Sequence, residues 1–437
     1  MLKKSVGCPT LFFTFSEVIL TQINETKAIL VTIAERGSEV AECERSLDEL
    51  ERLLDTAGGT CFAKIIQVKE AFDPRTCIGK GKVAEIKELC EANEVDLVVF
   101  DFELTPAQIR NLEKDIEVAA VIDRSMLILD IFALHATSGE GKLQVELAQL
   151  KYSAPRLIGK GSELSRQGGG IGTRGPGESK LETDRRHLHE RVVALERKLE
   201  ELEENRATMR QQRDKSGLTK VALVGYTNAG KSSLLNKLTG ADVLAQDKLF
   251  ATLDPTTRKM ELPDGVSILL TDTVGFIRKL PHHLVKAFKS TLDEVRYADI
   301  LLIVSDAGDP ETEEHIAVAR EVIADLDASD KPTIYVYNKC DTLEDAQYGI
   351  RGEDRVNVSA RTGEGVDGLL SLISEYIMRS KKVCRLLIPY SEQGIVSSLY
   401  NTYTVNSVDY LAEGVAVEAV LDSRALGLYA RYIQDEV

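Results

Sequence analysis

The stretch Val221-Ala-Leu-Val-Gly-Tyr-Thr-Asn-Ala-Gly-Lys-Ser232 decides the fold of this 437-residue chain. An apolar run typical of a buried strand leads into the spacing GxxxxGK[ST], and a helical pattern, SSLLNKL, follows. Gly225 and Gly230 let consecutive backbone N–H groups face one anion. Lys231 can reach terminal phosphates, and Ser232 offers a hydroxyl to Mg²⁺. The stretch therefore predicts a phosphate-binding loop that also uses the positive end of the following helix.

Three later segments, each placed after an apolar run, indicate which base is bound. Asp272-Thr-Val-Gly275 would bring a carboxylate to the water shell of the metal and a glycine amide to the γ-phosphate. In Asn338-Lys-Cys-Asp341, the carboxylate of Asp341 can accept two N–H groups of guanine that adenine does not offer, while the Lys339 stem covers the ring. Ser359-Ala360 would supply a backbone N–H for the guanine O6. Together these motifs predict a site for GTP and GDP.

This set of motifs resembles the Ras-like GTPases, and the segments between the motifs resemble the HflX family of ribosome-associated GTPases. The second resemblance rests on 247–258, DKLFATLDPTTR, and on 272–277, DTVGFI. It implies that Thr252 completes Mg²⁺ coordination with Ser232 when GTP is bound; from chemistry alone Thr252 could also be an ordinary loop residue. We expect the catalytic residues to be Thr252, Gly275 and Lys231. The residues expected to contact the nucleotide are Gly225, Tyr226, Thr227, Asn228, Ala229, Gly230, Lys231, Ser232, Ser233, Phe250, Thr252, Asp272, Gly275, Asn338, Lys339, Asp341, Ser359 and Ala360.

The residue after Gly275 departs from the Ras-like pattern. There a glutamine orients the attacking water, whereas Phe276 can neither donate nor accept a hydrogen bond. Unassisted hydrolysis should therefore be slow, with help from a backbone group, a partner or a monovalent cation. Asn228 is a candidate for holding K⁺, because related P-loop GTPases use an asparagine at that place. Alternatively, the Asn228 side chain closes the loop by a hydrogen bond.

The composition fits several domains. A chain of this length predicts about three. Seven cysteines without a C-x-x-C pair argue against a disulfide frame or a structural zinc site. No apolar run approaches the roughly 18 residues that span a bilayer, and Pro9 interrupts the apolar patch near the start. We expect a cytoplasmic monomer without stable membrane insertion, in which residues 1–25 form an N-terminal extension.

Residues 26–138 alternate short apolar runs with helical patterns, which predicts a small βα domain with a largely parallel sheet. The expected strands are Ala28–Ile33, Cys61–Gln67, Asp96–Phe100 and Ala119–Ile122. The helices expected between them are Ser46–Thr56, Gly81–Ala92 and Pro106–Glu113. Cys77-Ile-Gly-Lys-Gly-Lys82 opens the second helix and is either an anion-binding turn or a flexible basic turn. IGKGK and VFDFELTPAQIRNLE also resemble the N-terminal domain of HflX proteins.

Residues 139–216 predict a helical hairpin with a glycine-rich loop. Glu140–Tyr152 and about Glu178–Asp214 have helical patterns, and leucines recur every seven residues along the second, giving a seam for one partner helix. The intervening loop is either a linker or an element that contacts RNA. From Lys151 to Arg186 eight basic residues stand against four acidic ones, in a chain whose net charge is −16. The resemblance implies that the loop reaches the large ribosomal subunit, through Arg166, Gln167, Gly168, Gly169, Gly170 and Arg174.

The fold class expected is a multi-domain α/β protein. A P-loop GTPase domain with a mixed, mostly parallel sheet occupies 217–382, after the βα domain and the hairpin. A small α+β domain fills 383–437, and we expect it to end in a helix over Ala425–Ile433. The resemblance implies a GTPase that dissociates or rescues stalled ribosomes. The same motifs allow a GTPase of ribosomal subunit assembly, or a GTP-dependent regulator of a protein partner.

Overall fold

The computed structural model describes residues 26–36, 39–157, 176–215, 218–240, 249–250, 254–279, 289–343, 352–379, 382–421 and 423–436. The chain divides into two compact units. The first unit comprises residues 1–202, 246–254 and 277–291, and the second comprises 203–245, 255–276 and 292–437. Thr252, the predicted extension 1–25 and the predicted RNA contacts 166–170 and Arg174 lie outside the described residues.

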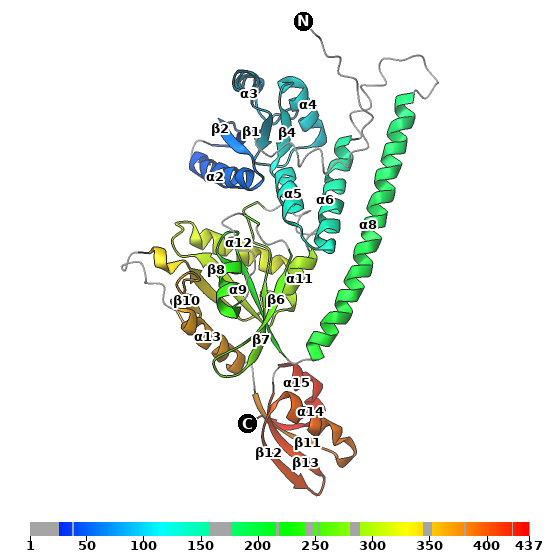
Figure 1. Ribbon diagram of the computed structural model, residues 1–437, viewed down its shortest axis with the longest axis vertical. Helices are drawn as coiled ribbons and strands as arrows, with labels where there is room; N and C mark the ends of the chain where they lie inside the picture. Colours follow the sequence, from blue (N-terminus) through cyan, green and yellow to red (C-terminus); the bar gives the residue numbers. More distant parts are fainter. Residues whose placement is uncertain are drawn as a thin grey trace. The chain divides into compact units, whose positions relative to one another are not determined.

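A four-stranded sheet forms the centre of the first unit, with the order β2-β1-β3-β4 and every pairing parallel (Figure 1). Its apolar strands are covered on both faces, as the burial of nearly all of β1 shows. The largely parallel sheet expected from the sequence is thereby confirmed. The strands are β1 Lys27–Ala34, β2 Thr60–Val68, β3 Leu97–Phe100 and β4 Ala120–Asp123.

Helices alternate with these strands. The first three are α2 Val40–Thr56, α3 Lys80–Asn93 and α4 Pro106–Ile116. Thr105 and Gln108 form a reciprocal capping box at the start of α4. A further helix, α5 Arg124–His135, follows β4 directly and was not among the predicted helices. The backbone N–H of Met126 donates to the Asp123 carboxylate at its N-terminus, and its almost continuous burial hides the amphipathic period that would have marked it.

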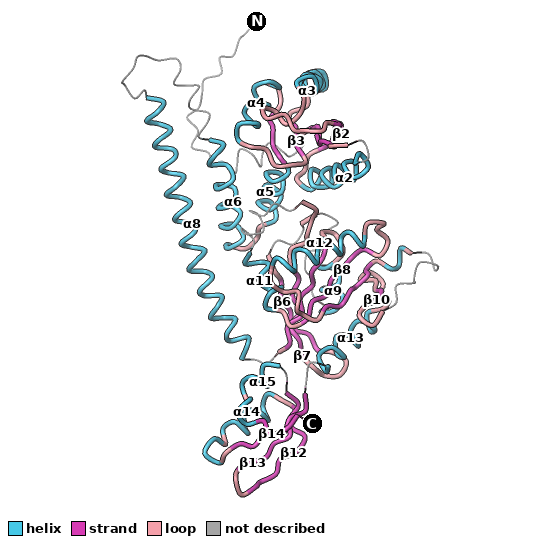
Figure 2. Tube along the Cα trace, turned by 180° about the vertical axis from the view of Figure 1, so that it is seen from behind, coloured by secondary structure: helices cyan, strands magenta, loops and turns pink. Residues whose placement is uncertain are grey.

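Two helices form the predicted hairpin, α6 Gly139–Leu157 and α8 Pro176–Lys215. They lie side by side (Figures 1 and 2), and ion pairs join Arg191 to Glu146 at 2.7 Å and Lys151 to Glu196 at 2.8 Å. Leu195 is fully buried. Four other side chains on the same face of α8 are partly buried, namely Leu188, Val192, Leu199 and Leu202. Most other described side chains of α8 are exposed. The leucine period therefore marks the packed face of α8.

The second unit contains a six-stranded sheet with the order β10-β9-β8-β5-β7-β6, parallel except for the β6–β7 pair. This confirms the mixed, mostly parallel sheet. Helices α9 and α13 share one core with it. The strands are β5 Thr219–Gly225, β6 Thr256–Glu261, β7 Ser267–Asp272, β8 Ile300–Asp306, β9 Thr333–Asn338 and β10 Arg355–Asn357. The helices are α9 Lys231–Thr239, α11 Lys289–Tyr297, α12 Thr312–Asp325 and α13 Val366–Arg379.

An antiparallel sheet ordered β12-β13-β11-β14 forms the C-terminal part of the chain. Its elements are β11 Lys382–Ile388, α14 Gly394–Thr402, β12 Thr404–Leu411, β13 Gly414–Leu421, α15 Ser423–Leu428 and β14 Ile433–Glu436. The helix expected over Ala425–Ile433 ends at Leu428. Tyr429 and Tyr432 enter the core, and the final residues pair with β11. Strand pairing at an open sheet edge thus outweighs the local helical pattern.

Candidate nucleotide site

Two glycines shape the loop between β5 and α9. Gly225 has φ +142°, and a Cβ there would lie 2.1 Å from the carbonyl oxygen of Val304. Gly230 has φ +86°, and its Cβ would lie 2.3 Å from Nδ2 of Asn338. No side chain fits at either position, so the loop presents backbone at both ends, as a phosphate-binding loop requires. Ala229 is buried and Ser233 follows in the first turn of α9.

Lys231 is buried in the same loop. Its Nζ donates to the carbonyl oxygens of Tyr226 at 2.8 Å and Gly225 at 3.2 Å. Burial lowers the pKa of Lys231 to about 8, and the nearby Asp272 carboxylate acts in the opposite direction. A phosphate bound beside this ammonium group would favour its protonated form and so oppose the effect of burial.

The end of β7 brings the metal-side residues together. The hydroxyl of Ser232 donates to Oδ2 of Asp272 at 2.6 Å. A hydroxyl and a carboxylate are hard oxygen donors, and Mg²⁺ in such sites combines one or two of them with substrate phosphates and water. Gly275 lies against the loop, because a Cβ there would lie 2.7 Å from Cα of Thr227. The donor set fits a magnesium ion.

Phe276 pairs with the loop through its backbone only. Its N–H donates to the carbonyl oxygen of Gly225 at 3.0 Å, and its carbonyl accepts from the N–H of Thr227 at 2.8 Å. The ring is 1% exposed. The side chain that stands in place of the water-orienting glutamine is therefore a packing residue, while its main chain joins β7 to the phosphate loop.

The base-side residues converge from two strand ends. The Nδ2 of Asn338 donates to the carbonyl oxygen of Ala229 at 2.9 Å, and its Oδ1 accepts from the N–H of Ala360 at 3.0 Å. Asn338 thus ties the phosphate loop to the predicted guanine O6 loop. The Nζ of Lys339 lies 2.8 Å from Asp306.

Asp341 is held as an anion beside these residues. Ser359 Oγ donates to Asp341 Oδ1 at 2.6 Å, and Arg361 forms an ion pair with the other oxygen. The hydrogen bond from Ser359 lowers the pKa of Asp341, and the Arg361 charge lowers it further. An ionised carboxylate is the acceptor that guanine N–H groups require.

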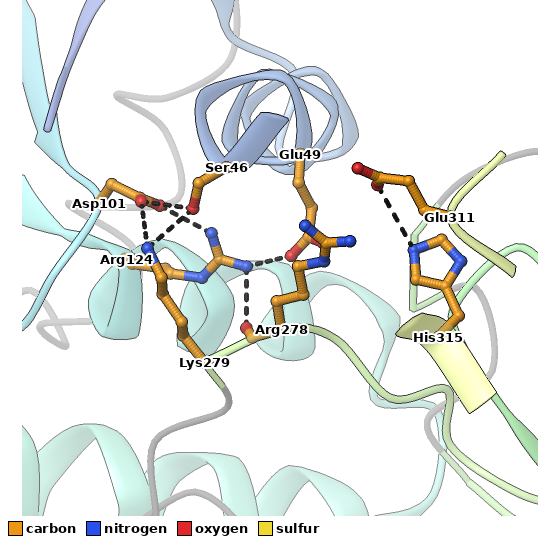
Figure 3. Close-up of polar contacts among 8 residues, drawn as sticks. All are labelled: Ser46, Glu49, Asp101, Arg124, Arg278, Lys279, Glu311 and His315. Carbon is orange, nitrogen blue, oxygen red and sulfur yellow. Dashed lines mark hydrogen bonds and ion pairs between the residues drawn. The ribbon is translucent and has the colours of Figure 1, made fainter. Parts of the chain in front are cut away.

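One contact of the phosphate loop has no motif in the sequence. Tyr226 stacks on His315 of α12, with ring centroids 3.8 Å apart and an angle of 16°. Asp309 and Glu311 lie within 4 Å of the two nitrogens of the His315 ring, and Figure 3 shows the Glu311 contact. Sequence reasoning missed His315, because a single histidine inside an amphipathic helix carries no spacing that would mark it.

Phe250 and Thr252 were both predicted to belong to the site. Phe250 is 2% exposed and packs edge-on against Phe132 of α5, with centroids 4.6 Å apart. This packing lies within the first unit, to which Phe250 belongs, and its contact with nucleotide stays a prediction. Asn228 is exposed and has φ +60°.

The residues directly after Phe276 enter a buried polar cluster of the first unit (Figure 3). Lys279 Nζ lies 3.1 Å from Asp101 Oδ2 and 3.0 Å from the Ser46 hydroxyl. Arg124, 2% exposed, donates to Asp101 Oδ1 at 2.8 Å, pairs with Glu49, and donates to the carbonyl oxygen of Arg278 at 3.0 Å. No sequence motif predicted this cluster.

The mostly parallel sheet, the glycine-shaped loop around Lys231 and the converging Asp272, Asn338 and Asp341 define a P-loop GTPase. Three family models match successive parts of the chain: "GTP-binding GTPase N-terminal" at 44–133, "GTP-binding GTPase Middle Region" at 135–213, and "50S ribosome-binding GTPase" at 220–339. A protein named GTPase HflX from Lacrimispora saccharolytica is 48% identical over 411 residues, covering 93% of this chain and 96% of that protein. The chain belongs to the HflX family of GTPases and hydrolyses GTP.

Other relatives have the same name. GTPase HflX from Caldanaerobacter subterraneus subsp. tengcongensis is 50% identical, with 91% of each chain covered. The Escherichia coli protein is 46% identical over 82% of this chain and 85% of its own length. The crystal structure of a GTP-binding protein from Sulfolobus solfataricus in complex with GDP aligns at 25% identity and a TM-score of 0.42, covering 80% of this chain and 98% of that one.

Within the described ranges, no helix has both the length and the apolar character needed to cross a membrane.

Proposed function

We propose that this GTPase binds the large ribosomal subunit in its GTP state and dissociates stalled or idle ribosomes, and that hydrolysis to GDP and phosphate resets it. The observation that carries the proposal is family membership along nearly the whole chain, including a G-domain family described as a "50S ribosome-binding GTPase". The basic, glycine-rich segment between α6 and α8 supports contact with ribosomal RNA. The protein acts as a cytoplasmic monomer.

The site residues take the following roles in this proposal. The backbone of 225–233 and the Lys231 ammonium hold the phosphates, while Asn338, Asp341 and Ala360 read guanine. Ser232 and Thr252 coordinate Mg²⁺, which neutralises charge that develops on the phosphates. Support comes from the 2.6 Å contact between Ser232 and Asp272 and from Gly225 and Gly230, where a Cβ would collide with Val304 and Asn338, so that the loop presents only backbone there.

Asn228 supplies a place for K⁺. Its left-handed backbone and exposed side chain at the loop tip suit a ligand to an ion beside the phosphates. GTP turnover should be faster in KCl than in NaCl, and N228A should remove the difference. Equal rates of the parent protein in both salts would exclude the K⁺ site.

Sedimentation tests the ribosomal role. Intact ribosomes mixed with the protein and a nonhydrolysable GTP analogue should separate into subunits on a sucrose gradient. Binding only to precursor particles would favour subunit assembly instead, and no comigration would favour a regulator of another protein. The double variant R166A/R174A should weaken ribosome binding and leave GTP affinity intact. A matched control, R197A/K198A, removes the same charge from exposed positions of α8 outside the basic stretch and should bind ribosomes normally.

A further inference from the structure

The ring of Tyr226 holds one end of the phosphate loop against helix α12. It stacks on the His315 ring at a centroid distance of 3.8 Å and an angle of 16°. Both side chains are buried, Tyr226 at 7% exposure and His315 at 8%. Aromatic pairs stabilise a structure beyond the area that they bury. Both residues belong to the second compact unit, so the stack lies within one part of the molecule.

The backbone of Tyr226 belongs to the phosphate loop itself. Its carbonyl oxygen accepts a hydrogen bond from Lys231 Nζ at 2.8 Å. Tyr226 also forms a parallel β-bridge with Phe276, which joins the loop to the residues after β7. A shift of the Tyr226 ring would therefore move the start of the loop and the acceptor of the Lys231 ammonium together.

His315 is held in place by the residues that lead into α12. Its backbone N–H donates to the carbonyl oxygen of Glu311 at 2.9 Å. The ring nitrogens lie 3.7 Å from Asp309 Oδ2 and 3.9 Å from Glu311 Oε2, and Figure 3 shows the second contact. Asp309 Oδ1 accepts from the N–H of Glu311 at 2.9 Å, which fixes that carboxylate. The imidazole is therefore restrained on the face of Tyr226.

The same segment contacts the motif that is predicted to read guanine. The N–H of Ala307 donates to the carbonyl oxygen of Asn338 at 2.7 Å, and Asp306 Oδ2 lies 2.8 Å from Lys339 Nζ. Residues 306–315 thus contact the guanine motif at one end and the phosphate loop at the other. All of these residues lie in the second unit.

We propose that His315 is a positioning residue for the binding of GTP and GDP, acting through the Tyr226 ring on the phosphate loop. The proposal rests on the phosphate-binding role proposed above for residues 225–233. A loop that is already held in its binding conformation loses less conformational freedom when the nucleotide binds, so affinity is higher. Because the loop holds phosphates in the ground state and in the transition state alike, loss of the stack raises KM and leaves kcat unchanged.

Three substitutions of His315 separate the stack from the polar contacts of the ring. H315A removes the ring, H315F keeps a flat ring without the nitrogens, and H315Q keeps polar atoms without a ring. H315A and H315Q should weaken GDP affinity and raise the KM for GTP about 3- to 10-fold, which is the contribution of one aromatic pair. H315F should bring both quantities back to within about twofold of the parent protein.

A variant of the same helix controls for loss of stability alone. Ile323 lies near the C-terminal end of α12 and is 4% exposed, so I323A leaves a cavity in the core. I323A should lower the midpoint of thermal unfolding and keep the parental KM and GDP affinity. If His315 only stabilised α12, H315A would behave like I323A.

A double variant tests whether His315 acts through Tyr226. In Y226A the loop has already lost its side of the stack, so adding H315A should change GDP affinity by less than about twofold. The measurements are equilibrium binding of GDP, GTP turnover without ribosomes, and the midpoint of thermal unfolding. If H315A does not fold, the comparison of H315Q with H315F decides the same question.

Four results would overturn the inference. These are parental GDP affinity in a folded H315A, rescue by H315Q but not by H315F, additive losses in the double variant, and a loss of kcat at constant KM. Parental GDP affinity in both K231A and G230A would instead overturn the phosphate-binding role of the loop, and this inference with it. Because the assays contain no ribosomes, failure of ribosome dissociation alone leaves the inference standing.

Discussion

The nucleotide site and the contacts that hold its flanking segments are built in different ways. Residues close together in sequence make the phosphate loop, and its shape comes from backbone at Gly225 and Gly230. The flanking segments are held by side chains far apart in sequence: Asp254 and Ser138 are 116 positions apart, and Lys279 and Asp101 are 178 apart. The comparison shows that the nucleotide motifs are compact in sequence, whereas the flanking segments are held by isolated polar residues that only the fold brings together.

Removing the Lys231 side chain should have the largest effect, a loss of GTP turnover. K231A deletes the ammonium proposed to hold the phosphates, and the loss of one such group lowers kcat by about 100- to 1,000-fold. The unfolding midpoint should hold, because Lys231 anchors only loop carbonyls. K259A, an exposed lysine on β6, serves as the control. A loss of less than tenfold in K231A would mean that the backbone carries the phosphate contacts alone.

Breaking the buried cluster should affect stability more than nucleotide binding. R124A leaves the buried Asp101 carboxylate without its closest guanidinium, and removing one partner of a buried pair costs about 3 to 5 kcal/mol. R75A removes an exposed guanidinium that pairs with Asp115 in the same unit and should cost at most about 1 kcal/mol. Guanidinium chloride unfolding compares the two, with GDP affinity measured alongside. Equal losses in both variants would show that burial does not decide the value of the Arg124 pairs.

A smaller effect, dependent on pH, is expected at Asp130 between α5 and α6. Burial raises the pKa of Asp130 from 3.8 to about 7, although Gln149 donates to it at 3.1 Å. Because the folded state binds the Asp130 proton more tightly than the unfolded state, protonation of Asp130 stabilises the fold. This stabilisation is full below pH 4 and is lost as pH rises through 7.

D130N, which stays neutral, should therefore gain about 2 kcal/mol over the parent protein between pH 5 and pH 8. The free energies of unfolding of both proteins at pH 5 and pH 8 measure this gain. D264N changes an exposed residue of the β6–β7 turn and should keep the parental pH dependence. If the free energy of unfolding of D130N changed with pH as steeply as that of the parent protein, Asp130 would be charged throughout this range.

The sequence predicted the elements whose local signals agree with their surroundings. Strands β1, β3 and β5 contain continuous apolar runs, and α8 shows its packed face through the period of Leu188, Leu195 and Leu202. Helix α5 was missed because burial on all sides removes its polar face. The helix expected after Ala425 was too long because β14 pairs with β11, a contact between residues about fifty positions apart.

The sequence by itself determined the phosphate loop, the guanine motifs and the family. Their chemistry requires fixed residue types at fixed spacing after each of several strands, and this spacing is visible in a linear chain. The tertiary structure alone decided that Phe276 is a packing residue, that Tyr226 stacks on His315, and that Asp254 is held by Thr137 and Ser138. Each of these depends on distances between residues remote in sequence. Such distances are set by the packing of whole elements, and a single aspartate or histidine gives no sign of which partner the fold will bring to it.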